Sequence, residues 1–106
     1  VAWLHEVGAK NVCITLGKEG TYFSNAQKEQ IVKSIAIHQV DATGAGDAFV
    51  GALLARILFA EKRLFSFEEW LELVRFANCV GALTCTKYGA IDAIPTLDEV
   101  LFYYNN

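Results

Sequence analysis

Residues Val40–Phe49 combine small side chains with a single carboxylate in a pattern that suits phosphate chemistry. The small residues Gly44–Gly46 precede Asp47, and a largely apolar run then extends to Phe59. This pattern predicts a tight turn that opens a buried helix, with Asp47 in its first turn. The unpaired backbone N–H groups at a helix start attract anions. A carboxylate beside such a site can accept a proton, and together they could transfer a phosphoryl group to a hydroxyl.

A simpler explanation for Asp47 is electrostatic. A carboxylate in the first turn stabilises a helix by about 0.3–1 kcal/mol through the helix dipole. The glycines favour the chemical explanation, because a Gly-Ala-Gly start costs conformational entropy that a better capping residue would avoid. From these residues alone, both interpretations of Asp47 stay open.

A second glycine segment lies nearer the start of the chain. Residues Asn11–Leu16 are typical of a buried strand, and Gly17-Lys18-Glu19-Gly20 follows it as a turn. Taken alone, this segment is an ordinary hairpin turn. It is not a P-loop, because no Gly-Lys-Ser/Thr closes it, and the chain also lacks a G-x-G-x-x-G fingerprint.

The two segments together resemble the PfkB, or ribokinase-like, carbohydrate kinases. The second signature of that family reads Asp-Thr-x-Gly-Ala-Gly-Asp. Here Asp41 and Gly44–Asp47 match it, whereas Ala42 stands where a hydroxyl residue or proline is more usual. The segment Thr15–Gly20 is similar to the family's Thr-Leu-Gly-x-x-Gly segment, which lines the nucleotide phosphates. Two such segments in the right order make the resemblance specific.

The resemblance implies a role for each of these residues. Asp47 would accept the proton of a sugar hydroxyl as that hydroxyl attacks the γ-phosphate of ATP. The N–H groups of Ala45, Gly46 and Asp47, in the turn that Gly44 opens, would hold the charge that develops on the phosphoryl oxygens. Mg²⁺ would arrive with ATP and bridge its phosphates. The expected ATP contacts are Thr15, Gly17, Gly20, Gly46 and Asn78.

Asn78 and a later loop complete the expected site. Asn78 is a polar residue on an apolar helix face. It is either a hydrogen-bonded buried amide or, as the family implies, a group near the adenine or its ribose. The stretch Thr84–Ala90 resembles a loop that encloses a monovalent cation, K⁺ in those members that depend on it. The implied cation ligands, the last three chiefly through carbonyls, are Asp41, Thr43, Thr84, Lys87 and Gly89.

The order of predicted elements indicates the fold class. We expect a helix tail at residues 3–7, strands at 11–16, 21–24 and 31–37, and a helix from the Asp47 turn to Phe59. Two capping boxes, Ser66–Glu69 and Thr96–Glu99, predict helices that run to about Thr84 and through Tyr104. Strands mixed with helices of this length indicate an α/β architecture with helices covering a sheet.

The resemblance refines this expectation to a fragment of a ribokinase-like sandwich, with helices packed on a central sheet. Residues 1–106 would form the carboxy-terminal part of a single PfkB-type kinase domain. The chain starts at Val1 and contains no Met, so we expect it not to be an intact translation product. The chain is 54% hydrophobic, and part of its apolar surface is therefore expected to pack against something that these residues do not include.

Composition also limits the partners. A net charge of −3 argues against general binding of nucleic acid, and no 18-residue stretch is apolar enough to predict a membrane span. Cys13, Cys79 and Cys85 lack CxxC spacing and indicate buried thiols in a reducing cytoplasm rather than a disulfide or zinc site. His5 and His38 are isolated and are expected at the surface or at strand ends.

The expected function is ATP-dependent phosphorylation of a sugar hydroxyl. The stretch Gly89–Thr96 is most like fructokinases, so we expect fructose to be converted to fructose 6-phosphate, by a full-length protein that forms a homodimer. Alternatives are another PfkB-family enzyme, such as a ribokinase, a 2-keto-3-deoxygluconate kinase or a nucleoside kinase, or a non-catalytic nucleotide-binding fragment. The family's amino-terminal sugar-binding residues have no counterpart here, so the chain alone is expected to be inactive.

Overall fold

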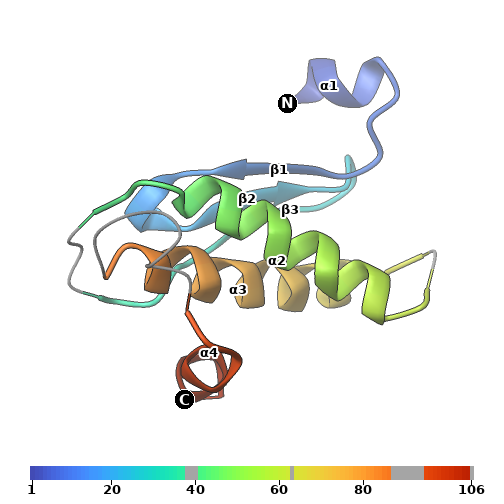
Figure 1. Cartoon of the computed structure of the whole chain (residues 1–106). Helices are drawn as coiled ribbons and strands as arrows, with labels where there is room; N and C mark the ends of the chain where they lie inside the picture. The colour runs from blue at the N-terminus through green and yellow to red at the C-terminus, as the bar shows by residue number, and fades with distance from the viewer. Residues whose placement is uncertain (38–40, 63, 87–94, 106) are drawn as a thin grey trace.

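The computed structural model describes residues 1–37, 41–62, 64–86 and 95–105. The two long helices pack on one face of a three-stranded sheet (Figure 1). This arrangement confirms the α/β class expected from the sequence. The elements in chain order are α1 (Ala2–Glu6), β1 (Val12–Thr15), a 3₁₀ turn (Gly17–Glu19), β2 (Thr21–Ser24), β3 (Glu29–Val32), α2 (Ala45–Phe59), α3 (Phe67–Thr84) and α4 (Leu97–Tyr104).

The sheet is an antiparallel meander in the order β1-β2-β3. Phe23 in β2 lies opposite Cys13 in β1 and Gln30 in β3. The Leu16 N–H donates to the Gly20 carbonyl oxygen at 2.8 Å and closes the β1–β2 turn. This short turn brings the first glycine segment to one end of the sheet.

Two strand predictions were wrong in detail. The third strand was expected at 31–37, but β3 starts at Glu29 and ends at Val32. Residues 33–37 have no regular secondary structure, and the backbone at residues 32–34 lies against Gly20. The first strand is not fully buried, because Ile14 is exposed on the face that the helices do not cover.

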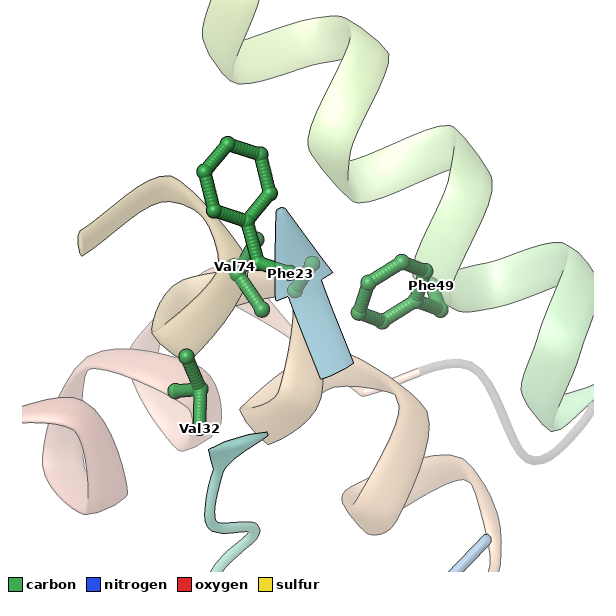
Figure 2. Packing of buried hydrophobic residues seen from close by; sticks show 5 residues of the cluster. Phe23, Val32, Phe49 and Val74 are labelled. Carbon is green, nitrogen blue, oxygen red and sulfur yellow. The ribbon is translucent and has the colours of Figure 1, made fainter. Parts of the chain in front are cut away.

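The main core lies between the sheet and the two long helices. The Phe23 side chain is completely buried and packs in a cluster with Val32, Phe49 and Val74 (Figure 2). Its ring also stacks on that of Trp70 in α3, with 5.4 Å between the ring centroids. Burying a phenylalanine side chain contributes about 1.5–3 kcal/mol, so Phe23 ties β2 to both helices.

Helices α3 and α4 start where their capping boxes predict. The Ser66 Oγ accepts from the Glu69 N–H at 3.1 Å, and the Glu69 carboxylate accepts from the Ser66 N–H at 2.9 Å. Thr96 and Glu99 make the same reciprocal pair, each bond at 3.2 Å. Each pair satisfies two N–H groups that a helix start would otherwise leave without partners.

Helix α2 differs from the expectation of a buried helix. Phe49 is the residue of α2 that is buried, whereas Val50, Leu54 and Leu58, spaced four apart, are exposed. The helix is apolar on all sides, so its sequence cannot indicate which side packs on α3. The exposed stripe agrees with the expectation that the chain presents apolar surface.

The cysteines are free thiols, as expected. Cys79 and Cys85 are buried and Cys13 is half-buried. Burial raises the pKa of the Cys13 thiol to about 11. His5 hydrogen-bonds to the Ala9 carbonyl oxygen and the Ser24 hydroxyl, and His38 lies outside the described residues.

The described part of the chain contains no helix with the length and hydropathy needed to cross a membrane.

Candidate functional site

The two glycine segments meet at one cavity of about 520 Å³. The turn after β1 forms one wall, and the first turn of α2 forms another. The α3 helix and the irregular stretch after β3 complete the lining. The lining residues are Thr15, Gly17, Lys18, Gly20, Thr21, Ser34, Ile35, Ala36, Ile37, Ala42, Ala45, Gly46, Phe49, Asn78, Gly81, Ala82 and Cys85.

The start of α2 has the geometry of an anion site. Gly44 adopts a left-handed conformation with φ of 80° and has no side chain that could cap the helix. The Ala45 N–H donates to the Ala42 carbonyl oxygen at 3.2 Å. The N–H groups of Gly46 and Asp47 have no hydrogen-bond partner among the described residues. Of the three amides expected to bind an anion, these two are therefore the ones that remain available.

Gly46 lines the cavity and has open space on the side where a Cβ would stand. A Cβ built on Gly46 would meet no other atom within 4 Å. The side chain of the next residue, Asp47, is exposed and is not among the residues that line the cavity. A ligand anion could therefore approach the helix start while the carboxylate stays free to accept a proton.

The turn between β1 and β2 brings a cation to the opposite wall. Gly17 has φ of 63° and Gly20 has φ of 106°, both in the left-handed region that favours glycine. Among the described residues that line the cavity, Lys18, which lies between these glycines, is the one that carries a charge. Thr15 lines the cavity just before the turn. The expected ATP contacts of this segment thus share one surface.

The Asn78 side chain lines the cavity and is also fully engaged with the sheet. Its Oδ1 accepts from the Thr21 hydroxyl at 2.7 Å, and its Nδ2 donates to the Val32 carbonyl oxygen at 2.9 Å. The sequence left two roles open for Asn78. The structure shows that it is a hydrogen-bonded buried amide, and its contact with a nucleotide stays a prediction.

The two segments expected to enclose a monovalent cation lie next to each other. The Asp41 N–H donates to the Cys85 carbonyl oxygen at 3.0 Å. The Asp41 carboxylate accepts from both the N–H and the hydroxyl of Thr43, at 2.9 and 2.6 Å. The buried Thr84 hydroxyl donates to the Val80 carbonyl oxygen. These contacts hold the first segment against the carboxyl end of α3.

The remaining expected cation ligands, Lys87 and Gly89, lie outside the described residues. The described residues contain no group of three or more His, Cys, Asp or Glu side chains that could hold a metal ion.

Three features of the cavity were not identified from the sequence. Ile35 and Ile37 were expected in a strand but line the cavity instead. Gly81 lets α2 approach α3 closely, because a Cβ there would lie 3.3 Å from the Ala45 carbonyl oxygen. Lys18 could have been found from its place as the basic residue within a glycine turn.

Comparisons with known proteins give the same family as the sequence motifs. The model of the pfkB family of carbohydrate kinases matches residues 1–97. Fructokinase-1 from Zea mays is 46% identical over 92 residues, which cover 87% of this chain and 28% of that protein. A ribokinase from Staphylococcus aureus (strain COL) is 37% identical over 94 residues, covering 89% and 29%.

A solved structure agrees over almost the whole chain. The fructokinase from Vibrio cholerae O395, solved in its fructose, ADP and calcium ion bound form, superposes with a TM-score of 0.86 at 35% identity. The match covers 95% of this chain and 32% of that one. The fold is therefore ribokinase-like, and the chain spans less than a third of the length of these relatives. This chain belongs to the pfkB family of carbohydrate kinases.

Proposed function

We propose that this chain supplies the nucleotide-binding and proton-accepting part of an ATP-dependent sugar kinase. The observation that carries the proposal is the shared cavity. The glycine turn after β1 and the uncapped start of α2 line it together, although 24 residues separate Gly20 from Ala45 (45 − 20 − 1). The exposed Asp47 carboxylate follows directly in the first turn of α2.

In this proposal each wall handles one part of the phosphoryl transfer. Thr15, Gly17, Gly20 and Lys18 contact the phosphates of ATP from the β1 side. The free N–H groups of Gly46 and Asp47 point their hydrogens at the oxygens of the moving phosphoryl group. The positive end of the α2 dipole adds to that stabilisation. The Mg²⁺ bound to ATP supplies further charge neutralisation.

Asp47 then acts as the general base. Its carboxylate removes the proton from the sugar hydroxyl while the hydroxyl oxygen attacks the γ-phosphorus. The bond between that phosphorus and the bridging oxygen of ADP breaks, and ADP leaves. A positioned base contributes about 10²–10⁴ to the rate of such a step. Exposure keeps the carboxylate reachable by a substrate bound over the cavity mouth.

We infer fructose as the acceptor and fructose 6-phosphate as the product. The support is the similarity to fructokinases, together with the neighbour solved with fructose. The ribokinase relative keeps ribose kinase as the main alternative. A potassium ion held by Asp41, Thr43, Thr84, Lys87 and Gly89 would stiffen the turn before α2, and the Asp41–Cys85 hydrogen bond already joins the two segments concerned.

The expected setting follows from the same relatives. Free thiols support a reducing, cytoplasmic compartment. Small molecules, a sugar and ATP, are the proposed ligands, without nucleic acid or membrane, and a homodimer is proposed for the full-length kinase. The chain spans about 28% of the maize relative, so we propose that it turns over sugar only when the remaining part of a kinase domain is supplied.

A chimera tests this function. In it, the matching segment of the Zea mays fructokinase-1 is replaced by this chain. We expect ATP consumption with fructose, with lower rates on ribose and on 2-keto-3-deoxygluconate, and none from the 106-residue chain alone. A chimera that folds but consumes no ATP with any sugar would contradict the kinase proposal. Consumption with ribose alone would replace fructose by ribose as substrate.

A further inference from the structure

The Asn78 amide, which comes from α3, is hydrogen-bonded to the two strands β2 and β3. It is 6% exposed, and its partner Thr21 is completely buried. The Thr21 hydroxyl donates to the Asn78 Oδ1, and the Asn78 Nδ2 donates to the carbonyl oxygen of Val32. An unpaired polar group at this depth would be costly, so these two bonds fix the orientation of the amide.

Both partners of Asn78 adjoin Gly20. Thr21 is the next residue along the chain. The Val32 carbonyl oxygen would lie 2.0 Å from a Cβ built on Gly20, so it sits directly against that glycine. One side chain of α3 thus holds both the residue that follows the last glycine of the turn and the carbonyl group that lies against this glycine.

We propose that Asn78 is a positioning residue for the Gly17–Gly20 turn and does not read the base of the nucleotide. This inference rests on the proposed nucleotide site. The amide fixes the distance between α3 and the turn, and thereby the place where the Gly17, Lys18 and Gly20 backbone meets the phosphates. The affinity of any ligand that binds the turn through its phosphates therefore depends on the distance between α3 and the turn, whatever base the ligand carries.

Base dependence therefore separates the two roles of Asn78. Truncating a residue that contacts the adenine weakens the binding of ATP alone, and truncating one that contacts the ribose weakens ATP and GTP. Either truncation leaves the binding of inorganic tripolyphosphate unaffected. Truncating a residue that positions the turn weakens the binding of ATP, GTP and tripolyphosphate by the same factor. We expect about a tenfold loss for each of the three, which corresponds to about 1.4 kcal/mol.

The test uses the 106-residue chain and isothermal titration with Mg²⁺ and each of the three ligands. Thr21→Val removes the hydroxyl but leaves Asn78 in place, and Thr21→Ser restores the hydroxyl. We expect the Val variant and Asn78→Ala to weaken all three ligands about equally, and the Ser variant to recover wild-type binding. Asn25→Ala is the matched control, because the Asn25 amide caps the distant β2–β3 turn.

Two results would overturn the proposal: tripolyphosphate binding that is unchanged in Asn78→Ala while nucleotide binding is weakened, or unchanged tripolyphosphate binding in Thr21→Val. If Asn78→Ala does not fold, Thr21→Val and Thr21→Ser decide the question alone. Amide hydrogen exchange of Leu16 and Gly20, whose N–H groups close the turn, gives a readout without ligand. We expect about tenfold faster exchange in Thr21→Val, and unchanged exchange would refute the positioning role.

Wild-type chain that binds none of the three ligands would contradict the proposed nucleotide site. The hydrogen-exchange result would still decide whether Asn78 positions the turn.

Discussion

Gly17 and Gly20 bracket the same turn but are glycine for different reasons. At Gly17 the backbone is left-handed, and a Cβ would enter open space. At Gly20 the backbone is also left-handed, and a Cβ would overlap the Val32 carbonyl oxygen. The first glycine is required for its conformation alone, whereas the second also makes room for the chain after β3.

Substituting each glycine by alanine separates these effects. Gly17→Ala should lower the free energy of unfolding by about 1–2 kcal/mol, the strain of a left-handed L-residue. Gly20→Ala adds overpacking against rigid backbone and should cost about 3 kcal/mol or more. Urea unfolding followed by circular dichroism measures both values. Equal decreases in the free energy of unfolding of the two variants would show that the backbone at Val32 moves away from the new Cβ at little cost.

Residue types were predictable at this site, but their contacts were not. The small residues before Asp47 and the glycine turn are local patterns, and the structure brings both to one cavity. The partners of Asn78 lie 57 and 46 residues away in the chain. No spacing rule predicts such a contact, because it depends on how α3 crosses the sheet.

At the scale of elements, α4 is held on α3 by the buried Val100 side chain and by its last residue, Tyr104. The Tyr104 hydroxyl donates to the Glu72 carboxylate at 2.8 Å, and the Arg75 guanidinium donates to the Tyr104 carbonyl oxygen at 2.8 Å. The same guanidinium lies 3.9 Å from the centroid of the Tyr104 ring, and the Phe76 ring meets it edge-on. Tyr103, one residue earlier, packs on Phe102 and is exposed.

These two neighbouring tyrosines form a matched pair for mutation. Tyr104→Ala removes the ring contacts and the Glu72 bond, and we expect it to cost about 2 kcal/mol, at the low end for a large-to-small change because the ring is half-buried. Tyr103→Ala should stay within about 0.5 kcal/mol of wild type, as surface changes usually do. Thermal unfolding compares them. A Tyr103 loss as large as the Tyr104 loss would contradict this view of α4.

The Glu72 carboxylate makes the α4 contact dependent on pH. Hydrogen bonds from the Tyr104 hydroxyl and then from Arg75 lower its pKa below the ordinary value of 4.5. The unfolded chain therefore binds a proton at a higher pH than the folded one does. This contribution to stability is present above about pH 4.5 and is lost as the pH falls through the lowered pKa.

Stability profiles between pH 3 and 7 should show this difference, because Glu72→Gln removes the titration. We expect wild type to lose its advantage over Glu72→Gln as the solution becomes more acidic. A constant difference across the range would contradict the assignment.

The starts of helices were predictable from the sequence where local capping residues mark them. The ends of elements were not predictable where they depend on tertiary packing. Ser66 and Thr96 predict the starts of α3 and α4, because an N-cap residue and its capping-box partner are three residues apart in the sequence. The end of β3 at Val32 has no such local signal, because the strand-like sequence continues through residues 33–37. The sequence also did not predict which side of α2 is exposed, because apolar residues occur on all sides of this helix.

At the scale of the whole molecule, apolar residues remain on the surface. The stripe on α2 includes Leu58, which is 77% exposed. The rest of a kinase domain, about 72% of the maize relative (100 − 28), has no counterpart in this chain. We therefore expect the isolated chain to associate with itself as its concentration rises.

Leu58→Lys tests this association. A charge at the most exposed residue of the stripe should lower the self-association measured by sedimentation, while far-UV circular dichroism stays unchanged. Lys33→Leu, which adds an apolar residue on a different exposed segment, is a control for the general effect of surface hydropathy. A wild-type chain that stays monomeric at high concentration would contradict the prediction.

The most direct measurement of the central claim is the turnover of the fructokinase chimera carrying Asp47→Asn. Asp98→Asn is its matched control, because Asp98 is also an exposed aspartate in the first turn of a helix. We expect Asp47→Asn to lower kcat by about 10²–10⁴ with ATP binding nearly unchanged, and Asp98→Asn to keep wild-type kcat. Equal kcat in the two variants would show that Asp47 is not the base.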